Sequence, residues 1–157
     1  MTKQARLIIV CGLPGAGKTT HAKKLAGELS AIRFCPDEWM EKLGINLYDE
    51  TTRSKIETLQ WEIAQAVLQA GGTAIIEWGT WGRSERDTLR LRARELGASV
   101  ELHYLTAPIE ELYKRVQLRG KEDPPIRKED LIAWGKIFQP PDATEIKLYD
   151  NPNSLTL

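Results

Sequence analysis

The sequence has little of what would assign its 157 residues to a specialised class. It contains two cysteines, too few for the disulfide framework of a small secreted domain. Its 22 basic and 22 acidic residues cancel, so no net charge attracts nucleic acid or an anionic membrane. No hydrophobic run is long enough to span a bilayer, and residues 1–6 lack the layout of a signal peptide. We therefore expect a cytoplasmic protein without a nucleic-acid or membrane partner.

Hydrophobic segments that read as strands alternate five times with segments of helical periodicity. This alternation is typical of a three-layer α/β fold with a parallel sheet, here of five strands. The expected domain covers residues 1–150, followed by a tail over 151–157. Strands are expected over 6–11, 31–35, 73–78, 99–106 and 144–149, and the main helices over 19–30, 51–70, 84–96, 108–119 and 128–136.

A glycine-rich stretch, VCGLPGAGKTT, follows the first expected strand. It fits the P-loop pattern G-x-x-x-x-G-K-[ST]. Glycines leave the backbone bare, so successive N–H groups and the N-terminus of the next helix can bind phosphates. The lysine reaches the β- and γ-phosphates, and the threonine hydroxyl binds Mg²⁺. The pattern predicts binding of a nucleotide triphosphate by Gly12, Leu13, Pro14, Gly15, Ala16, Gly17, Lys18, Thr19 and Thr20.

Two carboxylates are expected near this loop, because ligands of parallel sheets bind at the carboxyl ends of the strands. Asp37 follows the second strand, where it could accept the proton of an acceptor hydroxyl and orient its oxygen. A helix N-cap is the alternative for Asp37. Glu77 ends the hydrophobic run of residues 74–76 in the strand expected over 73–78, where a carboxylate can hold Mg²⁺ or its water. Glu77 could instead orient substrate, or have no role.

Arg115 and Arg119 stand four residues apart on one expected helix, just before a polar loop. We expect a short lid over about 119–128 whose arginines stabilise the transferred phosphoryl group and exclude water. Surface ion pairs with Glu111 or Glu122 are the alternative. Lys18, Asp37 and Arg119 are thus the candidate catalytic residues.

Aromatic and basic side chains near the strand ends suggest a substrate site that also includes the candidate base. Trp39, Trp78 and Trp81 could form an apolar or stacking wall, although each could equally pack in the core. Arg83 and Arg86 begin an expected helix and would suit a phosphorylated or carboxylated acceptor.

Several segments resemble the small P-loop kinase-like ATP-binding proteins grouped with zeta toxins, chloramphenicol phosphotransferase and the phage polynucleotide kinase domain. The resemblance extends from about Arg6 to Tyr149, and the P-loop and the Asp37 segment are its most specific parts. The segments are GLPGAGKTT, FCPDEWM, AIIEWGTWGRSERD, LYKRVQLR and FQPPDATE.

The resemblance implies the strand order 2-3-1-4-5 and makes Asp37 the base. It implies that Arg115 contacts the nucleotide, that Arg119 contacts phosphate from the lid, and that the 138–142 loop lies against adenine. The chain departs from the polynucleotide kinases at Met40, where they place an arginine that holds the nucleic acid phosphate. This departure argues against a polynucleotide acceptor.

The expected function is transfer of the γ-phosphate of ATP, with Mg²⁺, to a hydroxyl of a small molecule. Glu38 and Glu41 near the tryptophans favour a cationic acceptor such as an amino sugar or a similar antibiotic. Three alternatives are plain NTP hydrolysis, a nucleotide-binding switch module, and a polynucleotide or nucleotide kinase. A pure binding module would need no carboxylate opposite the γ-phosphate, so Asp37 separates these hypotheses.

Overall fold

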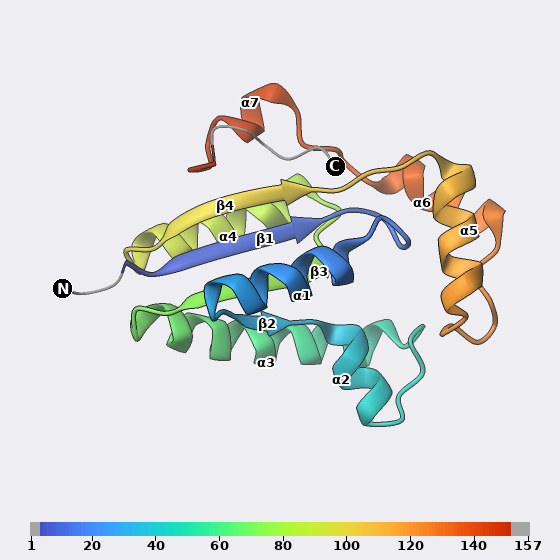
Figure 1. The fold of residues 1–157 in the computed structure, drawn as a ribbon, viewed down its shortest axis with the longest axis horizontal. Helices are drawn as coiled ribbons and strands as arrows, with labels where there is room; N and C mark the ends of the chain where they lie inside the picture. Colours follow the sequence, from blue (N-terminus) through green and yellow to red (C-terminus); the bar gives the residue numbers. More distant parts are fainter. Residues whose placement is uncertain (1–3, 152–157) are drawn as a thin grey trace.

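The computed structural model describes residues 4–151, so the expected tail lies outside the described residues except for Asn151. All strands of the sheet are parallel, in the order β2-β3-β1-β4 (Figure 1). This order confirms the parallel α/β class and the first four positions of the expected order. The strands are β1 Arg6–Cys11, β2 Ile32–Phe34, β3 Thr73–Gly79 and β4 Ser99–Tyr104.

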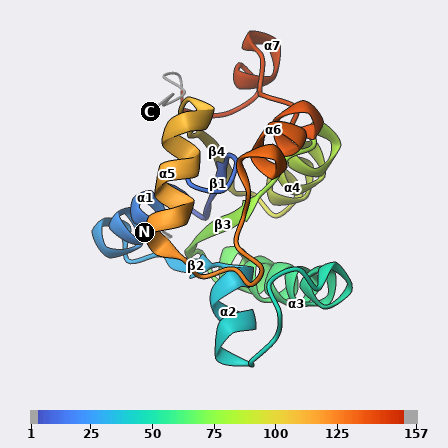
Figure 2. The same cartoon turned by 90° about the vertical axis from the view of Figure 1, so that its right-hand side faces the viewer.

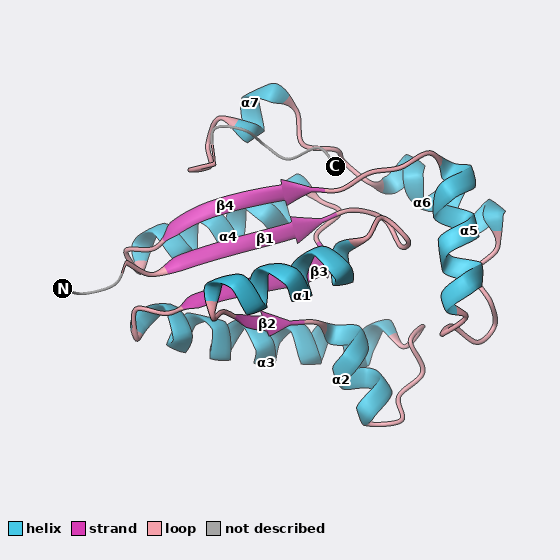
Figure 3. Cartoon of the chain, viewed as in Figure 1, coloured by secondary structure: helices cyan, strands magenta, loops and turns pink. Residues whose placement is uncertain are grey.

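Helices cover both faces of the sheet and so form three layers, as Figures 1 and 3 show. Helix α1 packs on one face, and α3 and α4 pack on the other. Helices α2, α5 and α6 lie beyond the carboxyl ends of the strands (Figures 1 and 2). The helices are α1 Lys18–Leu29, α2 Pro36–Lys42, α3 Glu50–Gln69, α4 Arg83–Glu95, α5 Ile109–Arg119, α6 Lys128–Ile137 and α7 Ala143–Ile146.

Strand β1 is buried along nearly its whole length because helices cover both of its faces. Leu7 and Ile9 belong to the hydrophobic cluster shared with α3 and α4. Ile8 and Val10 point the other way, into the cluster shared with α1, α5 and α6. This two-sided burial explains the uninterrupted hydrophobic run in the sequence and fixes the point where the P-loop leaves the sheet.

The expected fifth strand over 144–149 is wrong, since helix α7 and a turn occupy these residues. The Asp142 carboxylate caps α7 by accepting a hydrogen bond from the Glu145 backbone N–H at 2.8 Å. An N-cap aspartate satisfies a donor that the first turn of a helix leaves free. The sheet therefore has four strands within residues 4–151 rather than five.

The outer edge of β4 is covered by the backbone and side chains of residues 150 and 151 instead of by a fifth strand. The Asp150 backbone N–H donates to the Val100 carbonyl oxygen at 2.8 Å. The Asn151 amide accepts from the Leu102 N–H at 3.0 Å and donates to the Leu102 carbonyl oxygen at 2.7 Å. These bonds satisfy edge groups that would otherwise be free to pair with another chain.

The arrangement of the strands places the P-loop and the lid at one edge of the sheet. In Figure 1 all four strands point toward α2 and α5. Among residues 4–151, no helix has the length and hydrophobicity needed to cross a membrane.

Candidate functional site

The P-loop needs its glycines for steric reasons. Gly15 and Gly17 adopt φ values of 84° and 94°, a region that side chains strongly disfavour. A Cβ atom on Gly12 would lie 2.4 Å from the Leu105 carbonyl oxygen, and one on Gly15 would lie 2.7 Å from the Leu112 carbonyl oxygen. The residue that follows strand β4 and helix α5 thus press against the loop and fix its shape.

Lys18 begins helix α1 and folds back over the loop. Its ammonium donates to the carbonyl oxygens of Gly12 at 2.9 Å and Leu13 at 3.0 Å. Burial lowers the pKa of Lys18 to about 8, although the nearby Glu77 carboxylate opposes this shift. A desolvated ammonium at a helix N-terminus is well suited to a phosphate, because the phosphate would restore its charged form.

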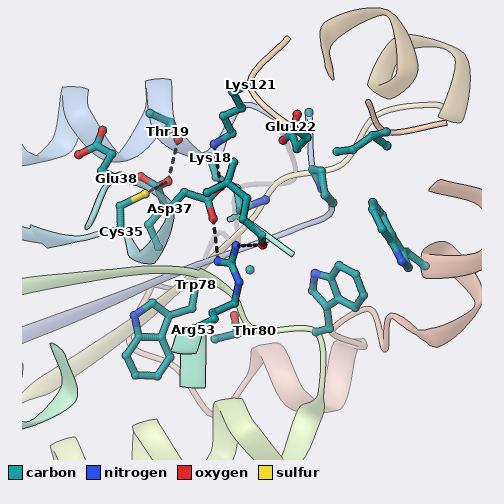
Figure 4. A pocket seen from close by; sticks show the side chains of 18 of the residues that line it. Lys18, Thr19, Cys35, Asp37, Glu38, Arg53, Trp78, Thr80, Lys121 and Glu122 are labelled. Atoms are coloured by element: carbon teal, nitrogen blue, oxygen red, sulfur yellow. Dashed lines mark hydrogen bonds and ion pairs between the residues drawn. The ribbon is translucent and has the colours of Figure 1, made fainter. Parts of the chain in front are cut away.

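A cavity of about 1000 Å³ opens beside the P-loop (Figure 4). Its walls come from α1, α2, α3, the end of β3, α4, α5, the lid and α6. Of the expected nucleotide-binding residues, Pro14, Gly15, Gly17, Lys18, Thr19, Thr20 and Arg115 line it. Leu13 and Ala16 instead border a small hollow against Phe138, whose ring stacks on Tyr104 at 5.7 Å between centroids.

Glu77 is buried at the end of β3 and lies at the centre of a polar cluster. Its carboxylate accepts hydrogen bonds from the Thr19 hydroxyl at 2.7 Å, the Arg33 guanidinium at 2.8 Å and the Cys35 thiol at 3.2 Å. Arg33 also pairs with Glu38 at 2.6 Å. Glu38 is therefore partly neutralised, and Glu77 presents its oxygens next to the P-loop threonine.

Asp37 lies inside helix α2 and does not cap it, since the N-cap residue is Cys35. Its two oxygens pair with Lys121 of the lid at 2.6 Å and with Arg53 of α3 at 2.7 Å (Figure 4). Burial alone would raise the pKa of Asp37, but these two cations outweigh it and lower the pKa to about 2. Asp37 is therefore ionised at neutral pH, in the same cavity as Lys18.

Both expected lid arginines reach the cavity and also make the ion pairs considered as alternatives. Arg115 donates to the Gly15 carbonyl oxygen at 3.1 Å and pairs with Glu111 at 3.0 Å. Arg119 pairs with Glu122 at 2.7 Å. The lid is also tied to the other side of the cavity, where the Tyr48 hydroxyl donates to the Pro124 carbonyl oxygen at 2.7 Å.

Two of the three expected tryptophans line the cavity. Trp78 and Trp81 are in its wall, and the Trp81 ring lies 6.0 Å from the Trp134 ring at a tilt of 46°. Trp39 is half-buried against the core cluster and is not in the cavity wall. The expectation that Trp39 contacts substrate is therefore wrong, and its side chain packs against the core instead.

The expected contact of Arg86 with substrate is also corrected. Arg86 is fully buried and makes a two-pronged ion pair with Glu145, at 2.6 and 2.9 Å. It also donates to the carbonyl oxygens of Thr80 and Gln139, both at 2.7 Å. Arg83 pairs with Asp87 at 3.5 Å and is not in the cavity wall. Both arginines therefore stabilise helix α4 and its packing against the segment after α6 instead of contacting substrate.

Sequence reasoning missed several charged residues that complete the cavity. Arg53 and Lys121 hold the candidate base, and Arg33 holds Glu77. Glu57 of α3 and Glu85 of α4 line the same cavity as Trp78 and Trp81. Helical periodicity could have pointed to Arg53 and Glu57, since they lie one turn apart on α3.

The residues present fit a nucleotide triphosphate and Mg²⁺. The Thr19 hydroxyl and a Glu77 oxygen lie 2.7 Å apart, and oxygens are the ligands that Mg²⁺ prefers. No cluster of three or more His, Cys, Asp or Glu suited to a metal occurs within residues 4–151.

Comparisons with known proteins show the family of this chain. The sequence profile of the AAA_33 family, described as an AAA domain, matches residues 7–141. A cytidylate kinase of Ignicoccus hospitalis is 30% identical over 123 residues, which are 72% of this chain and 64% of that protein. The chain therefore spans less than two thirds of the length of that curated relative.

Two solved structures share the fold. Kti12 of Chaetomium thermophilum, solved with ADP-AlF3, has a TM-score of 0.66 at 18% identity, over 92% of this chain and 86% of that one. A chain of the Pnkp1/Rnl/Hen1 RNA repair complex has a TM-score of 0.71 at 22% identity, over 96% of this chain and 48% of that one. These likenesses show the α/β fold of P-loop kinases.

Proposed function

Because this chain belongs to the AAA_33 family of AAA domains, we propose that it is an ATP-dependent phosphotransferase that acts on a hydroxyl of a small molecule. An amino sugar or a similar antibiotic-like compound is the acceptor that we propose. One observation carries this proposal: the Asp37 carboxylate shares a cavity with the P-loop and is held there by Lys121 and Arg53. A protein that only bound nucleotide would not need this carboxylate.

The chain's own residues divide the work of binding. The P-loop backbone and Lys18 bind the phosphates, and Arg115 and Arg119 add positive charge from α5. Thr19 and Glu77 would hold Mg²⁺, which when bound neutralises charge on the β- and γ-phosphates. The lid excludes water, so that transfer to the acceptor is favoured over hydrolysis.

Asp37 would orient the acceptor hydroxyl and take its proton while the hydroxyl oxygen bonds to the γ-phosphorus. The bond from that phosphorus to the oxygen bridging the β-phosphate breaks, and ADP leaves with the electron pair. Lys121 is close enough to Lys18 to contribute to lowering its pKa. In this proposal Lys121, which pairs with Asp37 at 2.6 Å, would move to phosphate when the nucleotide binds and so free a carboxylate oxygen for the hydroxyl.

An ADP-release screen tests the proposal directly. The panel contains amino sugars, nucleosides and sugar phosphates, and the variants are Lys18→Ala and Lys24→Ala. Lys24 is an exposed residue of the same helix and serves as the matched control. We expect acceptor-dependent ADP release in the wild type and in Lys24→Ala, and its loss in Lys18→Ala. ADP release that no acceptor stimulates would favour the hydrolase or switch hypothesis.

A further inference from the structure

Two carboxylates of the cavity have no part in the mechanism above. Glu57 of α3 and Glu85 of α4 both line the cavity and are half-buried. Neither forms an ion pair with any residue in the described range 4–151, whereas Asp37, Glu38, Glu77 and Glu122 all do. Two carboxyl groups without an ion-pair partner in this range therefore line the cavity.

The basic residues nearest to these two carboxylates already have other partners. Arg53 lies one turn before Glu57 on α3, but it pairs with Asp37 at 2.7 Å and donates to the Leu47 carbonyl oxygen at 3.0 Å. Arg86 follows Glu85 in sequence, but its guanidinium is directed into the core toward Glu145. Neither arginine forms an ion pair with Glu57 or Glu85, although the charge of Arg53 lowers the pKa of Glu57 and that of Arg86 lowers the pKa of Glu85.

Burial and mutual repulsion make this arrangement costly for the protein alone. Burial, reinforced by the charge of Glu85, raises the pKa of Glu57 to about 7. Burial also raises the pKa of Glu85, although the Arg86 charge and the Gly82 backbone N–H oppose the shift. A cation between the two carboxylates would remove both the repulsion and the unpaired burial.

Aromatic rings line the same cavity as the two carboxylates. Trp78, Trp81 and Trp134 line the same cavity, and the Trp78 ring is fixed because its N–H donates to the Gln60 side-chain oxygen at 2.9 Å. The faces of tryptophan rings attract ammonium groups. The wall thus combines two unpaired carboxylates with fixed aromatic surfaces, which is a suitable lining for an amine.

We propose that Glu57 and Glu85, with Trp78 and Trp81, bind the ammonium group of the acceptor, which is therefore a hydroxyl-bearing amine. This inference rests on the proposed phosphotransferase activity. The amine stays protonated and serves only as an anchor, while Asp37 acts on the hydroxyl. The two carboxylates also select against phosphorylated or carboxylated acceptors, because they would repel a second negative charge.

The anchor residues differ from those that the sequence suggested. Glu38 is committed to Arg33 and lies 3.5 Å from Lys23. Glu41 is exposed and lies 3.9 Å from Lys121. The carboxylates that would bind a cationic acceptor are therefore those of α3 and α4, not those of α2.

Matched acceptors and variants test this inference. The panel comprises amino sugars and aminoglycosides, the same compounds with every amine N-acetylated, and sugar phosphates. N-acetylation removes the positive charge and keeps the hydroxyls. The variants are Glu57→Gln, Glu85→Gln and the double variant, with Glu62→Gln, an exposed residue of the same helix α3, as the control. Kinetics of ADP release give KM and kcat for each acceptor.

We expect turnover of the amines and much weaker turnover of their N-acetylated counterparts. Each single variant should raise KM for the amine by roughly tenfold or more, with little change in kcat, and Glu62→Gln should match the wild type. Equal use of amines and N-acetylated compounds, preference for sugar phosphates, or an unchanged amine KM in the double variant would each overturn the inference while leaving the phosphotransferase in place. Absence of turnover with every acceptor would overturn both.

Discussion

Replacement of Arg86 by alanine should strongly destabilise the fold. Arg86 and Glu145 have 0% and 1% of their surfaces exposed and make a two-pronged ion pair. Removing one partner of such a pair typically costs about 3–5 kcal/mol, because the other charge is left buried alone. The carbonyl oxygens of Thr80 and Gln139 also lose donors. We therefore expect a loss of about 4 kcal/mol or more, a large part of the roughly 5–15 kcal/mol that stabilises a typical domain.

Thermal and urea unfolding measure this loss. For a chain of this size, about 4 kcal/mol corresponds to a fall in Tm of roughly 8–16 °C. Arg83→Ala is the matched control, because Arg83 is partly exposed and its ion pairs are long; it should cost less than about 1 kcal/mol. A double variant, Arg86→Ala with Glu145→Leu, should be less destabilised than the sum of the two single variants. Stability of Arg86→Ala within 1 kcal/mol of the wild type would refute the structural role.

Three further predictions concern the cavity. The rate of proteolysis within residues 120–127 should fall when an ATP analogue is added. It should rise in Lys121→Ala, which lacks the contact with Asp37, and stay unchanged in the control Lys114→Ala. The same cleavage rate in all of these samples would argue against a lid. Affinity for the analogue should fall by roughly fivefold between pH 8 and 9, because Lys18, with a pKa of about 8, must then regain a proton to bind phosphate. Calorimetry in two buffers would detect the proton uptake, and Lys18→Ala should abolish it. Glu77→Gln should raise the Mg²⁺ concentration for half-maximal activity by about tenfold, whereas the exposed control Glu28→Gln should leave it unchanged. An unchanged Mg²⁺ concentration for half-maximal activity in Glu77→Gln would show that Glu77 is not part of the metal site.

Local signals explain why much of the fold could be predicted. Glycine positions and a buried hydrophobic run define the P-loop and β1, and both depend on residues close in sequence. The helix expected over 84–96 begins one residue earlier, at Arg83, because Gly82 precedes α4 as its N-cap without a side-chain cap. The aspartate at position 142 does cap a helix, and recognising that pattern would have prevented the expectation of a fifth strand.

Long-range pairing explains what the sequence could not reveal. Lys121 lies 84 residues from Asp37, and Arg86 lies 59 residues from Glu145. No periodicity links such positions, so the partners of a charged residue emerge only from the folded chain. The expectation that Arg86 contacts substrate was wrong for the same reason. Its position near a strand end suggested that it faces the cavity, but its partner Glu145 is buried in the core.

The central claim is that Asp37 acts on an acceptor hydroxyl, and the variant Asp37→Asn tests it most directly. The change keeps the size of the side chain and removes the proton acceptor. The pKa depression of Asp37 from 3.8 to about 2 corresponds to about 2 kcal/mol. A depressed carboxyl pKa contributes this stability above pH 4 and loses it as the pH falls toward 2, so the variant should be weakened but folded at neutral pH.

The decisive measurement is kcat for acceptor phosphorylation alongside calorimetric binding of an ATP analogue. We predict that Asp37→Asn lowers kcat by about 10²-fold or more without weakening analogue binding. The control variant Asp123→Asn, at an exposed residue of the lid, should leave both kcat and analogue binding unchanged. A folded Asp37→Asn variant that phosphorylates acceptor at the wild-type rate would contradict the account.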